Sequence, residues 1–298
     1  MANDAIIDTI AKQAWLDQAA DPLQEAVHGA FVGEAGRALK NALHGTWLGH
    51  PLHPVLTDIP IGAWTVAAVL DVLEAVSDRE EIGTAADAAV AVGIAGALGS
   101  AITGLTDWSD TSDESRRVGL VHGLLNVAAT GLYVTSLVMR RRNRNRGTAI
   151  GLSMLGYAIS SSSAWLGGHL VFGEQIGVDH TATADAGKPN QFVAVISVGD
   201  LRDETPTRVV AEGVAVCLVK RRGHVFAITD TCPHLGGPLS EGKLVGEAIQ
   251  CPWHQSELAL HDGHVVNGPT TFPARSFETR IRDGKIEVRA AGAKEKVQ

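Results

Sequence analysis

Two kinds of hydrophobic pattern divide this chain of 298 residues. In its first part, four long stretches rich in Ala, Gly, Leu and Val carry few charged side chains; they cover about 55–76, 85–106, 118–139 and 148–172. Each stretch has roughly 20 residues or more, the length that a helix needs to cross ~30 Å of hydrocarbon. In the last part, short runs rich in Val, Ile and Phe alternate with turn residues, which is typical of antiparallel strands. The pattern predicts an all-α four-helix transmembrane bundle followed by an all-β domain.

Changes in composition along the chain predict where its parts begin and end. We expect an N-terminal amphipathic helical segment, the membrane bundle, a linker, the β domain and a short tail. Their predicted bounds are 1–45, 46–175, 176–190, 191–290 and 291–298. Apolar residues at near-helical spacing from Ile6 to Leu16 indicate that the first segment either lies on the membrane surface or docks onto the rest of the protein. The linker is rich in small polar residues and is predicted to be flexible.

A soluble helical bundle is the alternative for the four apolar stretches, and it is supported by Asp58, Asp71, Glu74 and Asp87. A charged side chain within a membrane span is tolerable, however, when it faces the bundle or lies near a helix end. The second and fourth stretches are also dense in Gly, Ala and Ser, as tightly packed membrane helices often are. We therefore favour the membrane bundle.

Arginines predict the orientation of the bundle. Several of them lie in the connection 140–146, and the positive-inside rule places that connection in the cytoplasm. With four spans, both chain ends then lie outside, so the β domain is predicted to be extracytoplasmic. Arg116 and Arg117 weaken this orientation, because they would lie in the short outer loop.

Charge and cysteine content narrow the possible functions. The net charge of -8 argues against nucleic-acid binding. Only three cysteines occur, so no disulfide framework is expected. Cys217 lies in an apolar strand pattern, where a buried and inert thiol is the simplest interpretation.

Two short motifs in the β domain combine sulfur and nitrogen ligands. The first is Cys232-Pro233-His234 and the second is Cys251-Pro252-Trp253-His254, with the sixteen residues 235–250 between them. Two thiolates and two imidazoles are the ligand set of a Rieske [2Fe-2S] centre. The same set could hold a zinc ion. A zinc finger, however, pairs cysteine with cysteine and histidine with histidine, whereas each motif here carries one of each.

The segment 190–290 resembles the Rieske ferredoxin family. The resemblance rests on Cys-Pro-His-Leu-Gly-Gly-Pro-Leu-Ser-Glu-Gly, on Cys-Pro-Trp-His, and on the later Gly268-Pro269 and Pro273. It implies that the cluster ligands are Cys232, His234, Cys251 and His254, with the two sulfurs on the buried iron and the two nitrogens on the outer one.

Departures from the family pattern bear on the reduction potential. Gly237 and Trp253 stand where the high-potential members have two further cysteines, so the disulfide between the loops is impossible. Gln255 replaces a usual glycine, and Leu258 stands in place of an aromatic residue, so the tyrosine hydroxyl that can bond a ligand sulfur is missing. Ser256 keeps the position where a serine often bonds a bridging sulfide. Fewer hydrogen bonds leave more charge on the cluster, so we expect a potential below the upper end of the range of about −150 to +300 mV.

Four histidines at the predicted outer face of the bundle are further candidates: His50, His53, His122 and His169. The first two belong to His-Pro-Leu-His-Pro, a motif that, together with four spans, resembles a family of uncharacterised bacterial membrane proteins. Ionisable groups in membrane helices are functional candidates by default. Three interpretations stay open: haem b or a second metal site, a quinone site or proton relay, and histidines that are merely hydrogen-bonded at helix ends.

The expected function is electron transfer rather than substrate conversion. Only 44 residues follow His254, too few for the catalytic domain of a complete Rieske oxygenase, and no G-x-G-x-x-G unit follows a strand. We expect a protein of the bacterial inner membrane that carries single electrons between a donor in the membrane, quinol or haem, and a redox protein or quinone partner. The alternatives are a quinol-oxidising oxidoreductase subunit with haem b, and a redox sensor. A homo-oligomer or a larger complex is compatible with each.

Overall fold

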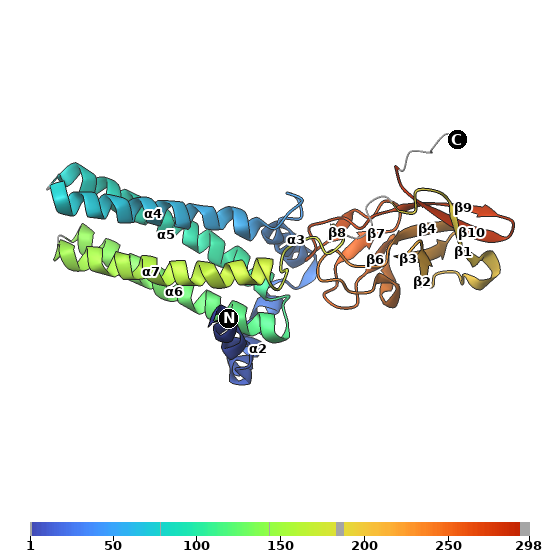
Figure 1. Cartoon of the computed structure of the whole chain (residues 1–298), viewed down its shortest axis with the longest axis horizontal. Helices are drawn as coiled ribbons and strands as arrows, with labels where there is room; N and C mark the ends of the chain where they lie inside the picture. Colours follow the sequence, from blue (N-terminus) through green and yellow to red (C-terminus); the bar gives the residue numbers. More distant parts are fainter. Residues whose placement is uncertain (1, 78, 143, 183–187, 293–298) are drawn as a thin grey trace. The chain divides into compact units, whose positions relative to one another are not determined.

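Figure 1 shows the fold in a computed structural model that describes residues 2–77, 79–142, 144–182 and 188–292. The chain forms two compact units. The helical unit consists of Met1–Leu39 and Pro51–Glu174, and the β unit consists of Lys40–His50 and Gln175–Gln298. An N-terminal helical part and a C-terminal all-β part were both predicted.

The helical half contains seven α-helices in the described residues, where an N-terminal helical segment and a bundle of four helices were predicted. Three are short: α1 (Ala2–Ala11), α2 (Asp17–Ala30) and α3 (Gly33–His44), with one 3-10 turn at Ala14–Leu16. Four are long: α4 (Leu52–Ser77), α5 (Glu80–Trp108), α6 (Asp113–Arg141) and α7 (Arg146–Phe172). The long helices coincide with the four apolar stretches, as the hydrophobic pattern predicts.

Among the residues that the structure describes, three helical segments are long and apolar enough to cross a membrane, namely Leu52–Ser77, Glu81–Trp108 and Asp113–Arg141. The fourth long helix, α7, has 27 residues, but the serines at 160–163 lower its mean hydropathy. Three spans therefore meet this standard, where the pattern predicted four. The prediction of four spans used only the length of each stretch and its lack of charged residues. It did not take into account that serine hydroxyls lower the hydropathy of a helix without adding charge.

The helical unit exposes apolar side chains and buries polar ones. Val66, Val69 and Val127 are 52%, 55% and 68% exposed, whereas Asp71 and Arg140 are 1% and 3% exposed. A water-soluble bundle has the reverse distribution, because large exposed apolar areas are unfavourable in water. The arrangement fits helices surrounded by lipid and disfavours the soluble alternative.

The N-terminal segment docks onto α6 and α7. Ile7 of α1 is buried against Val118 and Leu166 in one apolar cluster. At the start of α2, Asp17 pairs with Arg116 and Arg117 at 2.7 Å each. Hydrogen bonds from Arg117 and Arg116 lower the pKa of Asp17 to about 2. Of the two predicted roles for this segment, docking is the one observed, and the two arginines that weakened the predicted orientation have a structural partner.

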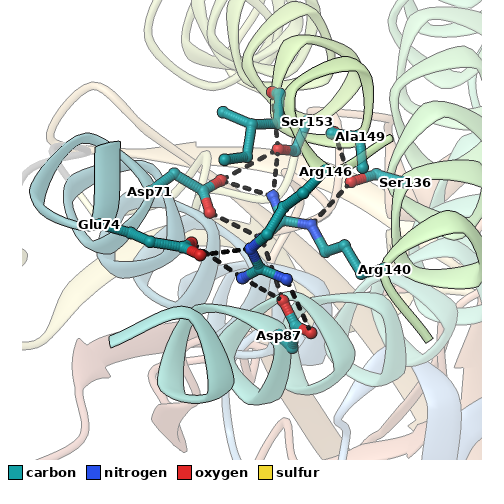
Figure 2. Close-up of polar contacts among 9 residues, drawn as sticks. Asp71, Glu74, Asp87, Ser136, Arg140, Arg146, Ala149 and Ser153 are labelled. Carbon is teal, nitrogen blue, oxygen red and sulfur yellow. Dashed lines mark hydrogen bonds and ion pairs between the residues drawn. The ribbon is translucent and has the colours of Figure 1, made fainter. Parts of the chain in front are cut away.

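A buried ionic network joins all four long helices at the end where α4 meets α5 and α6 meets α7 (Figure 2). Arg140 of α6 donates two hydrogen bonds of 2.6 Å to the carboxylate of Asp71 on α4. It also donates to Asp87 of α5 at 3.1 Å and to the Ser153 hydroxyl of α7 at 2.9 Å. Arg146, the first residue of α7, bonds Glu74 and also bonds Asp87 at 3.1 Å.

Charges this deeply buried are tolerable only when they are paired and fully hydrogen-bonded. The Asp71–Arg140 pair meets that condition, since the guanidinium makes bonds to two carboxylates and two hydroxyls. Of the four acidic residues that supported a soluble bundle, Asp71, Glu74 and Asp87 thus lie inside the helical unit or at its polar end, whereas Asp58 of α4 is exposed.

We predict that Arg140→Gln destabilises the helical unit strongly, because it leaves the Asp71 carboxylate buried without its counter-ion. The expected cost is about 3–5 kcal/mol. Unfolding of the detergent-solubilised protein measures this loss, and Arg141→Gln, which changes an exposed neighbour, is the matched control. The double variant Asp71→Asn with Arg140→Gln should recover part of the stability. Equal stability of Arg140→Gln and Arg141→Gln would show that the pair contributes nothing.

The β unit contains three antiparallel sheets. The first has the order β1 (Val193–Ser197), β10 (Lys285–Ala290), β9 (Phe277–Arg282), and the second has the order β2 (Thr207–Ala211), β3 (Val214–Arg221), β4 (His224–Thr229). The third has the order β5 (Lys243–Val245), β6 (Ala248–Gln250), β7 (Glu257–Ala259), β8 (Val265–Asn267). Inward-facing Val216, Leu218 and Ile286 are fully buried between the first two sheets.

Two segments outside the strands belong to this unit. The predicted bounds divided Lys40–His50 between the N-terminal segment and the bundle, yet Asn41 donates to Asn267 Oδ1 at 2.8 Å and accepts from the Gly268 N–H at 2.9 Å. The predicted flexible linker is ordered where it is described, since Thr181 is 2% exposed and its carbonyl accepts from Arg275. These contacts hold the described part of the linker against the rest of the β unit, and the flexibility of the linker as a whole stays a prediction. Residues 183–187 of the linker and 293–298 of the predicted tail lie outside the described residues.

Candidate metal centre

The first ligand loop follows β4 and runs from Thr231 to Pro238. The Cys232 N–H donates to the Gly237 carbonyl at 2.8 Å, and the Gly236 N–H donates back to the Cys232 carbonyl at 2.9 Å. Gly236 has φ of +80°, a conformation that glycine adopts without strain. These bonds close a tight turn that carries Cys232 and His234 side by side on the same loop.

The base of this loop is fixed by Asp230, a residue that the motif did not single out. Asp230 is 3% exposed, and its carboxylate accepts from the Ser240 N–H at 2.7 Å and from Arg208 at 3.0 Å. The Leu239 N–H bonds the Asp230 carbonyl at 2.7 Å. The two ends of the loop are thereby held together. An acidic residue at the end of an apolar strand, just before the first cysteine, was the available sequence signal.

The second ligand loop follows the β5–β6 hairpin. The Cys251 N–H donates to the Ser256 carbonyl at 2.8 Å, and the Gln255 N–H donates to the Cys251 carbonyl at 3.2 Å. Gln255 has φ of +63°, in the left-handed region. This explains why glycine is usual there, because a side chain in that conformation costs about 1 kcal/mol.

The two sulfurs lie together in the interior of the unit. Cys232 and Cys251 are 1% and 3% exposed and belong to one apolar cluster with Leu239, Ile249 and Leu258. A hydrogen bond from the Cys232 thiol, with help from the backbone N–H groups of residues 253 and 254, lowers the pKa of Cys251 to about 6. The same bond and burial raise the pKa of Cys232. One thiolate is therefore stabilised at neutral pH, which is what metal binding requires.

The two imidazoles lie nearer the surface. The ring centroids of His234 and His254 are 5.0 Å apart at an interplanar angle of 82°, and both residues are half-buried. The arrangement thus places two sulfurs inside and two ring nitrogens outside. This is the ordering that a two-iron cluster with a sulfur-ligated and a nitrogen-ligated iron requires.

The spacing of the four donors argues against a single zinc ion. Ligand atoms around one tetrahedral ion lie roughly 3.5 Å apart, given bonds of about 2.0–2.3 Å. Among the described residues, no three of these four donors have ligand atoms that all lie within 4.8 Å of one another. A Cβ atom on Gly237 would come 2.9 Å from Cys251 Sγ, so the chain lies as close to this sulfur as glycine allows. These residues fit a [2Fe-2S] cluster and fit one ion poorly.

Ser256 supplies a further contact to the sulfurs. It is 0% exposed, its hydroxyl donates to Cys232, and its Oγ accepts from the Thr270 N–H at 3.1 Å. Leu258, which stands in place of the aromatic residue, is fully buried in the apolar cluster. The serine hydroxyl therefore contacts a ligand sulfur, and its bond to a bridging sulfide stays a prediction.

The remaining cysteine, Cys217, lies in β3 outside the two loops but belongs to the same apolar cluster as Cys232 and Cys251, whereas the surface histidines lie at a separate turn. Burial raises the pKa of Cys217 in β3 to about 12, so its thiol is inert, as predicted. His261 and His264 are exposed at a turn, where both contact Asp262, at 3.1 and 2.7 Å.

The four membrane histidines do not form one cluster. His50 is exposed and belongs to the β unit, whereas the other three belong to the helical unit. His169 bonds Glu174 at 3.2 Å at the end of α7. His53 and His122 are half-buried, and each bonds a backbone carbonyl of the following helix. Of the four histidines, only His53 and His122 thus make the same kind of contact inside the bundle.

The fold and the loops define a class: a β domain in which two Cys/His loops hold a two-iron cluster, joined to an apolar helical bundle. Two family models match the chain, "Rieske [2Fe-2S] domain" over residues 191–278 and "Predicted membrane protein (DUF2231)" over residues 49–180. The chain belongs to the Rieske [2Fe-2S] family and carries a DUF2231 membrane domain at its N-terminal side. Its cofactor is a [2Fe-2S] cluster of the Rieske type.

Relatives with established names match the β unit. The ferredoxin CarAc of Metapseudomonas resinovorans is 36% identical over 98 residues, which are 33% of this chain and 92% of the relative. The ferredoxin subunit of anthranilate 1,2-dioxygenase from Burkholderia cepacia is 29% identical and covers 31% of this chain and 85% of its own length. The ferredoxin of carbazole 1,9a-dioxygenase from Nocardioides aromaticivorans IC177 is a solved structure with 25% identity and a TM-score of 0.32, covering 34% and 98% of the two chains. The relatives are electron-transfer components of dioxygenase systems.

We predict that Ser256→Ala lowers the reduction potential of the cluster by about 60–120 mV. A hydrogen bond to a charged acceptor is worth about 1.5–3 kcal/mol, and 59 mV corresponds to about 1.4 kcal/mol for a one-electron couple. A redox titration of the full-length protein measures the shift, with Ser197→Ala in β1 as a control for serine removal. An unchanged potential would mean that the hydroxyl does not act on the cluster sulfurs.

Proposed function

We propose that this protein is a membrane-anchored Rieske protein that carries single electrons between a donor in the membrane and a redox partner. The observation that carries the proposal is the division of the ligand residues, with both cysteines buried and both histidines near the surface, in a chain that also contains membrane-length helices. When bound, a [2Fe-2S] cluster supplies a reversible one-electron couple.

In this proposal Cys232 and Cys251 hold the inner iron, and His234 and His254 hold the outer iron. Buried thiolates in an apolar cluster keep water away from the sulfurs and fix their positions. The half-buried imidazoles are the part of the site that a partner can approach. A histidine at the surface can also release a proton when the electron leaves, which couples the two transfers.

The face beside the outer ligands suits a protein partner. Trp253, next to His254 in the second loop, is 56% exposed, and Pro252 is exposed as well. An exposed aromatic ring is a typical anchor of a protein interface. Because the relatives named above serve dioxygenase systems, we propose a redox protein rather than a small molecule as the partner.

A quinol-oxidising subunit is the second candidate, and a groove in the helical unit favours it. The groove has a volume of about 360 Å³ and lies between α4 and α7. It is lined by Thr65, Ala68, Val69, Val72, Leu73, Met154 and Tyr157. The Thr65 hydroxyl donates to the Ile61 carbonyl at 2.7 Å and lies 3.1 Å from the Tyr157 hydroxyl, so the carbonyl group of a quinone would have to take the proton that Tyr157 shares with Thr65.

We predict that the reduced full-length protein gives one electron per chain to an oxidised one-electron acceptor protein, such as a cytochrome c. Cys232→Ala should abolish the transfer, and Cys217→Ala should retain it. Optical spectroscopy follows both proteins. If the wild-type protein holds its cluster but transfers nothing to any acceptor tested, a sensor role replaces the carrier. If reduced quinone alone bleaches the oxidised cluster, the quinol-oxidising function is the better description.

We also propose that the protein lies in the bacterial inner membrane with the β unit outside the cytoplasm. The exposed arginines between α6 and α7 are Arg141, Arg142 and Arg144, whereas Arg140 and Arg146 belong to the ionic network. Three exposed positive charges still favour the cytoplasm for this connection. His50 before α4 and Gln175 after α7 then emerge on the other side.

Reporter fusions test this orientation. Alkaline phosphatase fused after Gly292, the last described residue, should be active, and green fluorescent protein fused at the same point should be dark. A fusion after Arg142 should give the opposite pair of results. Fluorescence at Gly292 together with phosphatase activity at Arg142 would place the β unit in the cytoplasm.

A further inference from the structure

The four long helices are two copies of one helix hairpin. His122, Tyr133 and Arg140 of α6 each follow a residue of α4 by 69 positions, and these residues are His53, Trp64 and Asp71. In the second helices, Gly156, Ser163 and Gly167 of α7 each follow a residue of α5 by 63 positions, and these residues are Gly93, Ser100 and Gly104. The contacts between α4 and α5 recur between α6 and α7 at positions shifted by these 69 and 63 residues. The α4–α5 and α6–α7 hairpins are therefore related by an internal pseudo-symmetry.

Equivalent residues of α4 and α6 meet inside the bundle at two levels. Asp71 pairs with Arg140 at 2.6 Å, and Trp64 stacks on Tyr133 with ring centroids 4.0 Å apart and an interplanar angle of 11°. His53 lies eleven positions before Trp64, which is three helical turns, and His122 lies eleven positions before Tyr133. The two histidines therefore lie on the same faces of α4 and α6 as Trp64 and Tyr133, three turns nearer the start of each helix.

Both aromatic side chains of the stack rest on equivalent glycines of the second helices. A Cβ atom on Gly93 would come 2.2 Å from Trp64, and one on Gly156 would come 3.1 Å from Tyr133. At the histidine level, a Cβ atom on Gly104 would come 2.6 Å from the His53 ring, and one on Gly167 would come 3.0 Å from the His122 ring. Each imidazole thus lies against a helix face kept open by glycine.

The hydrogen bonds fix the same tautomer in both rings. His53 Nδ1 lies 2.9 Å from the Ser100 carbonyl oxygen, and His122 Nδ1 lies 2.8 Å from the Ser163 carbonyl oxygen. A carbonyl only accepts, so each Nδ1 carries the proton and each Nε2 presents its lone pair. Metal-bound histidines are held in this way, with the second ring nitrogen donating to a carbonyl. At His122 the Asn126 amide, 3.2 Å away, donates to that lone pair.

We propose that His53 and His122 are the two axial ligands of a haem b in the helical unit. Two imidazoles complete the coordination of a haem iron, since the porphyrin supplies the other four nitrogens. A zinc or copper ion needs three or four protein ligands. Within the described residues, the only three His, Cys, Asp or Glu side chains with ligand atoms all within 4.8 Å are His261, Asp262 and His264, in the β unit.

This inference deepens the proposed function, because the haem would be the membrane donor of the electron that the Rieske cluster carries. The haem iron passes from the ferrous to the ferric state as the cluster takes up one electron, so one electron is lost and one is gained. His50 and His169 have no part in it.

The test is the absorption spectrum of the full-length protein purified in detergent from cells supplied with a haem precursor. We expect a Soret band and one haem b per chain in a pyridine haemochrome assay. His53→Ala and His122→Ala should each lose the haem or leave it high-spin, while His50→Gln and His169→Gln keep the low-spin spectrum. Added imidazole should restore that spectrum to His122→Gly, a rescue that a merely structural histidine would not give.

The electron paramagnetic resonance signal of the reduced Rieske cluster, recorded on the same samples, separates this inference from the proposed function. A cluster signal without a Soret band overturns the haem and leaves the electron carrier. A Soret band without a cluster signal overturns the carrier. The haem proposal would also be contradicted if the protein bound one zinc or copper ion per chain without porphyrin, and if that binding required both His53 and His122. A haem spectrum unchanged in both alanine variants would place its ligands elsewhere.

Discussion

The structure depends on one constraint: each of two separate loops must deliver one sulfur and one nitrogen to the same pair of irons. The loops can meet this condition only if their bases are fixed. Asp230 ties the ends of the first loop, and the Cys251–Ser256 bond closes the second. The apolar cluster around both cysteines then holds the sulfurs inward, so the imidazoles are left facing outward. In the proposed function, the burial of the cysteines and the partial exposure of the histidines would give the domain one insulated iron and one accessible iron.

In the helical unit, apolar contact cannot determine which helices pack together, because the surrounding lipid is as apolar as the helices themselves. The specificity of this unit comes from polar and aromatic pairs inside the bundle. The Asp71–Arg140 pair and the Trp64–Tyr133 stack join the first hairpin to the second at equivalent positions. Glycines and serines of α5 and α7 make room for these side chains and accept their hydrogen bonds. The two hairpins are thus joined through complementary residues at equivalent positions of an internal pseudo-symmetry.

The sequence predicts two Cys/His loops from a local signal of residue types and short spacings, and the structure brings the two cysteines together inside and the two histidines together nearer the surface. The sequence also predicts the long helices, since their apolar stretches are longer than any soluble core helix requires. It fails where the outcome depends on distant contacts. Asn41 draws its segment to the β unit through bonds to residues far along the chain, and Thr181 orders part of the supposed linker in the same way. The sequence did not reveal the pseudo-symmetry, because the equivalent residues differ in type. Asp71 corresponds to Arg140 and Trp64 to Tyr133, so only their spacing along the two helices is the same.

Mössbauer spectroscopy of the iron-enriched full-length protein tests the central claim most directly. The account predicts two cluster irons per chain in equal amounts, in two distinct environments, with the added electron of the reduced protein localised on the iron that carries the histidines. A single iron environment, or a purified protein that holds one zinc ion and no iron, would contradict it.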